Sequence, residues 1–456
     1  MDPQNEDNQP YTKEQHSAQD PQLSTEKITS VVNVEDGPSN SDEPDVEKSS
    51  YVEDNGCKDC AAKNELAAKH AREVTSMIFL KVLAMILAGV LIGVAFEKSK
   101  IYEPENIRAQ FVMRRFVMLK MFLAAVASGQ LCLAILSLLP LTKHNFAASA
   151  DSFKHNFEEK GILSSTVGAF ILGCGMAVSG ACPGMVLAQV GSWAKNSIFT
   201  LLGVFLGALL HGLTARWLIP LLRPRKRLKI LSLHQQFNIP YAAISIPLSL
   251  MVLLGVGLLE YFLPWYDDLS SWRRNDPSMN FVRAISWPPS IAGIIIGLMQ
   301  NVVVLGVEKT LGGSSGYCTV VSQWVVTKRL QDLFPTLAKA RRNKQNWWQV
   351  LYWGAAVVGA MCSAMASDTF ATAKGVTIEC AIFGGILMVF GSRCAAGCTS
   401  GHGLSGFALL QWLSFIAVPC MFGGGIVVGF IMQATGALCQ WDYHDYHVPI
   451  HDDTFC

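Results

Sequence analysis

Charged side chains are scarce in this sequence. Asp, Glu, Lys and Arg together make up 16% of its 456 residues, whereas a soluble domain carries about a quarter. The net charge is only +1, so no basic excess points to a nucleic-acid partner. The start of the chain is polar and acidic, and we expect no cleavable signal peptide there. The composition therefore argues against a soluble enzyme and against a nucleic-acid-binding protein.

Apolar residues, by contrast, make up 51% of the sequence and are gathered into long runs. Each run is long enough to cross a hydrocarbon core of about 30 Å as a helix. We therefore predict an all-α polytopic membrane protein with about nine transmembrane helices. The predicted segments are Met77–Phe96, Val112–Leu139, Ile162–Ala181, Ser197–Pro220, Ile239–Leu263, Ile291–Val307, Trp347–Ala366, Val376–Arg393 and Leu409–Met432.

These segments divide the chain into five predicted regions. A disordered acidic tail, 1–75, precedes a first transmembrane repeat, 76–222. A linker with one extra span, 223–289, leads to a second transmembrane repeat, 290–434, and a polar C-terminal tail, 435–456, follows. The tail compositions favour solvated chain over a packed domain.

Lys and Arg residues predict the orientation, because cytoplasmic loops are enriched in them. Two basic runs, 223–229 and 328–344, lie in loops that we place in the cytoplasm. Counting outward puts the N-terminus in the cytoplasm and the C-terminal tail outside. Arg108, Arg114 and Arg115 count against this orientation, since they fall near a loop placed outside. We expect the protein to reside in the plasma membrane.

The two halves share a weak repeat. Residues 167–182 align with 383–398 without a gap, at an offset of 216 positions, which places Cys182 over Cys398. If the span at 239–263 is an extra helix, the second half crosses the membrane in the opposite direction. Inverted repeats of this kind place a binding site near the midplane, where broken helices meet. The aligned glycines are Gly168 with Gly384 and Gly175 with Gly391.

Two short segments, 179–184 and 397–406, interrupt the apolar helices with Gly, Pro, Ser and Cys. At membrane depth such a loop must be buried in protein or line a cavity. A helix that starts after each loop would direct its amide N–H groups at it, which favours an anion. The alternative is a helix kink with small residues for packing. Two loops in register, each with a cysteine, favour a pair of re-entrant binding loops.

Cysteine suits a sulfur substrate, because its sulfur is polarizable and its thiol is a weak donor. Cys182 and Cys398 are the first candidates, and Cys318 follows a third Gly/Ser-rich break. Cys394 is either a helper thiol or a packing residue. His402 either donates to an anion or fixes its loop through a backbone contact. The remaining candidate substrate contacts from the loops are Gly184, Gly397 and Ser400.

Other patterns are weaker. Cys57 and Cys60 form a lone CxxC in a polar tail, and the histidines of the C-terminal tail fit a solvated segment better than a metal site. We predict no metal site, no cofactor and no enzymatic activity. The lipid bilayer and a small anion are the predicted partners, and the sequence leaves the oligomeric state open.

The loops resemble those of the sulfur transport family of bacterial permeases (YeeE/YedE). The segment 397–406 is similar to the family's signature loop. The segment 97–104, together with Cys182-Pro183-Gly184, is similar to one half-size member, and the second half resembles the partner half. The resemblance covers about residues 77–434 and implies a fusion of two half-size members. It implies thiosulfate transport past Cys182, Cys398 and Cys318, although the first half has no cysteine near Lys100 to match Cys318.

The sequence therefore favours a permease for a small sulfur-containing anion, with thiosulfate as the first candidate. A selenium compound, sulfide or a soft metal is the alternative cargo, because soft metals also prefer thiolates. An integral-membrane thiol redox or sulfur-transfer enzyme is the competing class, and it would need cysteines close enough to form a disulfide. A membrane scaffold would leave the repeated loops unexplained.

Overall fold

The computed structural model describes residues 57–158, 161–222, 232–268, 283–325, 327–342 and 346–442. The chain divides into two units, 1–68 and 69–456, and the second is described below. Most of the predicted N-terminal tail, the basic run 223–229 and the C-terminal histidines lie outside the described residues, as do the side chains of Cys57 and Cys60.

The described part of the chain is all-α and contains the predicted spans. Eight helices are long and apolar enough to cross a membrane, and a bent pair raises the number to nine. The pair is α16 (Ile378–Cys394) and π-helix η4 (Thr399–Gly406), bent by 47°. All nine predicted segments overlap these spans, so the predicted fold class is confirmed. The eight helices are α1 (Cys57–Lys98, with Arg72–Lys98 as the span), α3 (Val117–Leu138), α5 (Ile162–Ser179), α7 (Ser197–Leu222), α9 (Tyr241–Phe262), α11 (Pro289–Val307), α15 (Trp347–Ala366) and α17 (Trp412–Ala434).

Short elements connect these spans, and two of them form a small antiparallel sheet, β1 (Gly375–Val376) with β2 (Trp441–Asp442). Loops that are far apart in the sequence contact one another: the Lys195 N–H donates to Ala373 O at 3.3 Å, and Ser232 forms an isolated bridge with Gln411. These contacts join the ends of neighbouring spans. The other short elements are α2 (Pro104–Phe111), α4 (Lys143–Glu158), α6 (Met185–Gly191), α8 (Leu233–Gln236), η2 (Trp265–Asp268), α12 (Ser314–Ser322), α13 (Lys328–Leu333), α14 (Pro335–Arg342) and η5 (Ala437–Cys439).

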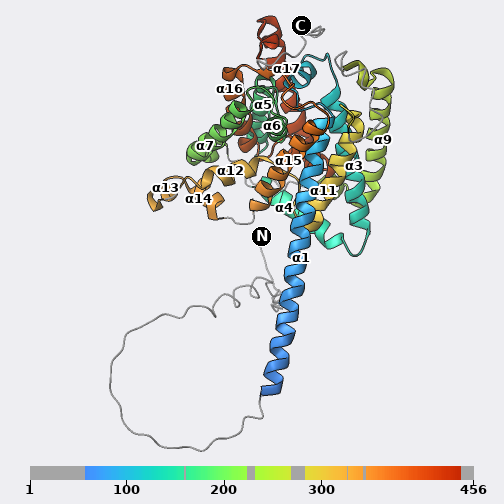
Figure 1. Ribbon diagram of the computed structural model, residues 1–456, viewed down its shortest axis with the longest axis vertical. Coiled ribbons are helices and arrows are strands. Elements are labelled where there is room, and N and C mark those ends of the chain that lie inside the picture. Colours follow the sequence, from blue (N-terminus) through green and yellow to red (C-terminus); the bar gives the residue numbers. More distant parts are fainter. Residues whose placement is uncertain are drawn as a thin grey trace, which may run out of the picture. The chain divides into compact units, whose positions relative to one another are not determined.

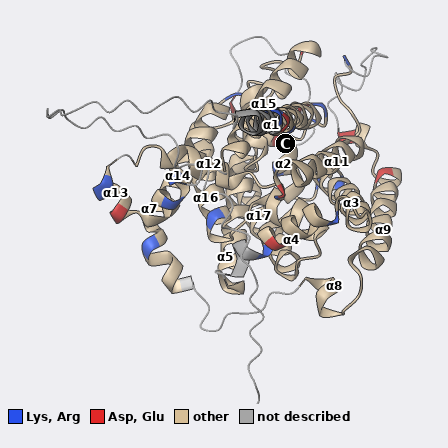
Figure 2. Ribbon diagram, turned by 90° about the horizontal axis from the view of Figure 1, so that it is seen from below, with Lys and Arg blue, Asp and Glu red and all other residues tan. Residues whose placement is uncertain are grey.

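The spans of unit 69–456 pack side by side in one bundle (Figure 1). The helix α5 packs against α16 and α17, and α16 also packs against α7. The helix α3 lies between α11 and α9. Figure 2 shows that most of the bundle carries no charge and that basic residues occur at α13 and α14. An apolar bundle with charges near its ends is the distribution that a bilayer requires.

Close backbone contacts at glycine hold α5 against α16. A Cβ added to Gly168 would lie 2.3 Å from Ala395 N, and one added to Gly384 would lie 2.5 Å from Ser179 N. These two contacts are related by the same offset of 216 positions that aligns the halves. Small residues permit such approaches between membrane helices. The reciprocal contacts support the repeat, and the inverted relation of the halves stays a prediction.

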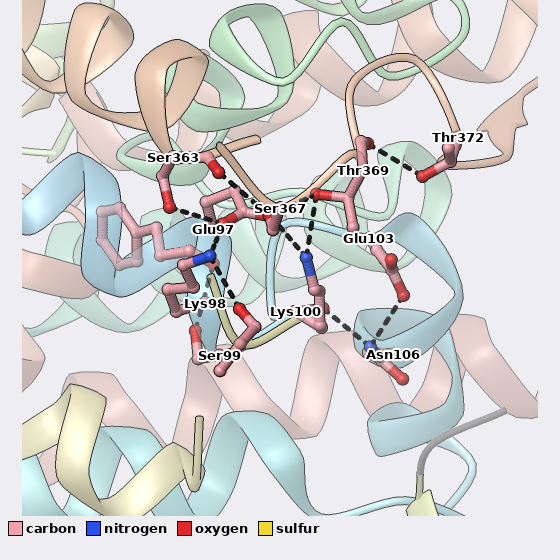
Figure 3. A network of polar contacts seen from close by, with 12 residues as sticks. Glu97, Lys98, Ser99, Lys100, Glu103, Asn106, Ser363, Ser367, Thr369 and Thr372 are labelled. Carbon is pink, nitrogen blue, oxygen red and sulfur yellow. Dashed lines mark hydrogen bonds and ion pairs between the residues drawn. The ribbon is translucent and has the colours of Figure 1, made fainter. Parts of the chain in front are cut away.

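A buried charge network joins the end of α1 to the end of α15 (Figure 3). Glu97 and Lys100 are fully buried. Lys100 Nζ donates to Glu97 Oε1, which also accepts from Thr369 Oγ1 at 2.8 Å. Ser363 Oγ of α15 donates to Glu97 Oε2 at 2.7 Å. Because each carboxylate oxygen has donors, the buried charge of Glu97 is compensated.

This network also positions α2. Asn106 Nδ2 donates to Lys100 O at 2.7 Å, and Arg115 Nη1 donates to Asn106 Oδ1 at 3.1 Å. Arg115 pairs with Glu105 at 2.8 Å. The first turns after α1 are therefore fixed by polar contacts in a region that is otherwise apolar.

Two neighbouring glycines of α17 provide a test of the packing. A Cβ at Gly424 would lie 2.2 Å from Phe170 O, whereas nothing lies within 4 Å of a Cβ at Gly423. We expect Gly424→Ala to destabilise the protein by about 1–3 kcal/mol through overpacking, and Gly423→Ala to leave it equally or more stable. Thermal unfolding of the detergent-purified protein measures both. Equal melting temperatures would contradict this packing.

The charge network predicts a coupled pair of substitutions. Lys100→Met removes the closest countercharge of Glu97, and breaking a buried pair on one side costs about 3–5 kcal/mol. The double variant Glu97→Gln/Lys100→Met should recover much of the lost stability, because no uncompensated carboxylate remains. Lys374→Met is the control, since Lys374 pairs at 3.7 Å with the partly exposed Glu105 and such pairs contribute about 0–1 kcal/mol. A double variant as unstable as Lys100→Met would show that the coupling is absent.

Candidate functional site

The first cysteine loop lies between α5 and α6. Gly180 ends α5 with φ +57°, a left-handed conformation that glycine adopts without strain. A Cβ there would also lie 2.6 Å from Pro104 Cβ. The chain then runs through Cys182, Pro183 and Gly184 before α6 begins. Cys182 is 8% exposed, so its thiol is enclosed by protein.

The second cysteine loop lies between α16 and η4. The helix α16 ends at Cys394, and Cys398 precedes η4 in an extended conformation. Cys398 is 1% exposed, and its Sγ lies 3.1 Å from Ser400 Oγ. A π-helix directly after the break is typical of functional segments in helices.

The two loops meet inside the bundle. Cys182 and Cys398 are close enough to interact electrostatically, and the Thr399 hydroxyl lies within hydrogen-bonding range of Cys182 Sγ. Tyr317 of α12 lies near both cysteines. Residues far apart in the sequence therefore converge on one buried sulfur-lined site.

Backbone N–H groups surround both sulfur atoms. Those of Gly313 and Ser314, at the start of α12, and of Gly401 lie within hydrogen-bonding range of Cys398 Sγ. Those of Gly184 and Met185, at the start of α6, lie within hydrogen-bonding range of Cys182 Sγ, and the Met185 N–H also donates to Cys182 O at 2.9 Å. The first amides of a helix have no intrahelical partner and carry partial positive charge. The site is therefore suited to negative charge on or beside sulfur.

The helix α12 is fixed to the first cysteine loop. The Tyr317 hydroxyl donates to Pro183 O, and the Tyr317 ring packs edge-to-face on Phe205 of α7, with centroids 5.9 Å apart. This contact holds the start of α12 between the two cysteines. An amide group that must face a ligand needs such a rigid support.

His402 has the anchoring contacts that were one of its two predicted roles. Its Nε2 lies 3.0 Å from Ala395 O and its Nδ1 lies 3.3 Å from Ser414 Oγ. Gly397 packs directly against the ring, since a Cβ there would lie 2.7 Å from His402 Cδ2. One ring nitrogen thus has a partner directly after α16 and the other has a partner on α17. The imidazole links these elements to the loop that carries Cys398.

The other predicted residues are also buried or packed against buried side chains, but their surroundings differ. Cys318 is buried in α12 and belongs to the same apolar cluster as Cys182. Cys394 is buried at the end of α16, and its carbonyl accepts from Ser164 Oγ at 2.8 Å. Gly184 packs against the Trp353 ring, with a Cβ position 3.2 Å from Cη2. A substrate contact by Cys318 or Cys394 stays a prediction.

Sequence reasoning missed four residues of the site: Gly313, Ser314, Tyr317 and Thr399. The Gly/Ser-rich break before Cys318 was the available signal for the first two, because such a break precedes a free helix N-terminus. The chain carries no local signal that Tyr317 would contact the loop of Pro183, which lies 134 positions earlier.

Within the described ranges, the nine cysteines outside α1 and η5 are free thiols, including all four candidates. No group of three or more His, Cys, Asp or Glu residues in the same ranges could hold a metal ion. The site is thus a set of thiols, hydroxyls and amides.

The sequence profile of the family described as "Sulphur transport" matches residues 98–427. The chain belongs to the sulfur transport family. The match begins within the charge network of Figure 3 and includes both cysteine loops. The sequence is also 21% identical over 354 residues to a protein described as "Thiosulfate transporter TsuA" from Escherichia coli (strain K12), covering 76% of this chain and 93% of that protein. The resemblance inferred from the loop motifs is therefore confirmed, and the family is one of transporters.

Two glycines of the second loop provide a matched test of this site. Gly397→Ala forces a shift of His402 or of the loop, whereas nothing lies within 4 Å of a Cβ at Gly401. We expect Gly397→Ala to reduce stability by about 1–3 kcal/mol, to lower the melting temperature accordingly, and to reduce transport. Gly401→Ala keeps its backbone N–H and should leave both unchanged. A tolerated Gly397→Ala would contradict the anchoring role of His402.

Proposed function

We propose that the protein is a permease that passes thiosulfate through the membrane by way of Cys182 and Cys398. The observation that carries the proposal is the pair of buried thiols, each surrounded by backbone N–H donors and joined by Thr399. Membership of the sulfur transport family and the similarity to a thiosulfate transporter support it.

The chemistry of the site fits this anion. Thiosulfate carries a soft terminal sulfur and harder oxygens on the central sulfur. Thiol sulfur is polarizable and contacts the terminal sulfur favourably, while amide N–H groups stabilise the negative charge without a countercharge. Weak, neutral contacts allow release as well as binding, which conduction requires. The anion moves from one thiol to the other without a covalent step.

The arrangement of the helices supports an inverted repeat around this site. When α4 of the first half and α13 and α14 of the second are set aside, each half has the same order of elements: a long helix, a short helix, two long helices, a short helix and a long helix. The cysteines lie before the second short helix of each half, α6 and η4. In an inverted repeat these two loops enter from opposite sides, so Cys182 and Cys398 would face opposite access paths.

We further propose that the N-terminus lies in the cytoplasm and that the membrane is the plasma membrane. Arg108, which counted against this orientation, is buried and donates to Val178 O at 2.7 Å and to Leu438 O at 3.0 Å. Because its guanidinium binds carbonyls at the C-terminal end of α5, Arg108 is not a solvated loop charge and does not count in the orientation rule. Cys439, near the opposite end of the chain, is disulfide-bonded, which fits an oxidising compartment on the C-terminal side.

Uptake of radiolabelled thiosulfate into proteoliposomes tests the proposal. We expect Cys398→Ala and Cys182→Ala each to reduce uptake at least about 10-fold, the loss expected for one contact to a charged group. Cys132→Ala is the matched control, because Cys132 is a half-buried thiol on α3. Melting temperatures must stay close to that of the unmodified protein.

Unchanged uptake in both loop variants would reduce these cysteines to packing residues. Absence of thiosulfate uptake in the unmodified protein would overturn the substrate assignment, and direct measurement of selenosulfate, hydrosulfide or Cu(I) uptake would then identify the alternative cargo.

A further inference from the structure

A buried tryptophan connects the two cysteine loops. Trp353 of α15 is 4% exposed. A Cβ at Gly184 would lie 3.2 Å from its Cη2, and a Cβ at Gly313 would lie 3.4 Å from its Nε1. The six-membered ring of the indole therefore packs on the first loop, and its N–H edge lies at the start of α12.

The indole N–H lacks an acceptor. Among the described residues, none accepts a hydrogen bond from Trp353 Nε1, although the atom is buried. Buried indole N–H groups usually have a partner, and an unpaired one costs free energy that phenylalanine at the same place would avoid. A ligand that accepts this hydrogen bond would remove the cost.

The neighbours of this N–H indicate the kind of ligand. The amides of Gly313 and Ser314 lie within hydrogen-bonding range of Cys398 Sγ, and Gly313 contacts the indole. Three N–H donors, two from the backbone and one from Trp353, thus gather at the N-terminus of α12. Such a cluster next to a thiol favours an oxyanion with a soft sulfur atom.

We propose that Trp353 is a substrate-binding residue whose Nε1–H donates to an oxygen of thiosulfate while the terminal sulfur contacts Cys398. The assignment rests on the proposed function and adds a residue that recognises the oxygen end of the anion. It predicts discrimination between thiosulfate and hydrosulfide, because hydrosulfide has no oxygen to accept the bond.

An isosteric substitution tests the N–H alone. Replacing Trp353 by benzothienylalanine exchanges the indole N–H for sulfur and keeps the ring, so packing on Gly184 and Gly313 is retained. We expect the KM for radiolabelled thiosulfate to rise about 10-fold, the loss of one hydrogen bond to an anion, with Vmax within about 2-fold. Inhibition of uptake by hydrosulfide should keep its concentration dependence.

Trp348 provides the control, because it lies on the same helix and its Nε1 is also unpaired among the described residues. The same replacement there should leave KM unchanged. Trp353→Phe should show a similar rise in KM, and its melting temperature reports any packing defect separately.

An unchanged KM in the Trp353 isostere would overturn this assignment while leaving the permease proposal intact. An equal loss of affinity for thiosulfate and hydrosulfide would also overturn it, since the oxygen contact would then be absent. Failure of the unmodified protein to take up thiosulfate would instead contradict the proposed function.

Discussion

The close backbone approach of α5 and α16 is the constraint on which the site depends. Each cysteine loop begins where one of these helices ends, and each helix meets the other at glycine, as Gly168 and Gly384 do. In a bilayer the hydrophobic effect does not draw helices together, so their association depends on the close van der Waals packing that small residues permit. Because α5 and α16 approach along their length, Cys182 and Cys398 arrive at the same place inside the bundle.

Polar groups at membrane depth then determine the chemistry of the region around Cys182 and Cys398. Water cannot satisfy the amides of the broken helices, so protein or ligand must do so. The amides around Cys398 face sulfur, and the Trp353 N–H has no acceptor among the described residues. Charged residues are used elsewhere: Glu97 and Lys100 join helix ends, and Arg108 binds the carbonyl end of α5. The residues named above around the two cysteines thus include no charged side chain.

The two halves use their first short helices differently. In the first half, Arg108, Asn106 and Arg115 tie α2 into polar contacts with neighbouring carbonyls and carboxylates. In the second half, the start of α12 has no charged side chain and its amides turn toward Cys398. Near Lys100 the first half thus places polar and charged side chains that hold α2, whereas the second half places amides beside Cys398.

The sequence by itself determined the spans, the two broken segments and the cysteines in register, because hydrophobic length and Gly/Pro breaks are local properties of the chain. The loop motif also carried the family resemblance. Only the tertiary structure decided which groups surround the sulfur atoms. Tyr317 meets Pro183, and Trp353 meets Gly184 and Gly313, across more than 30 residues of chain. Such contacts depend on how helices pack, and packing of similar apolar helices leaves no signal at the level of single residues.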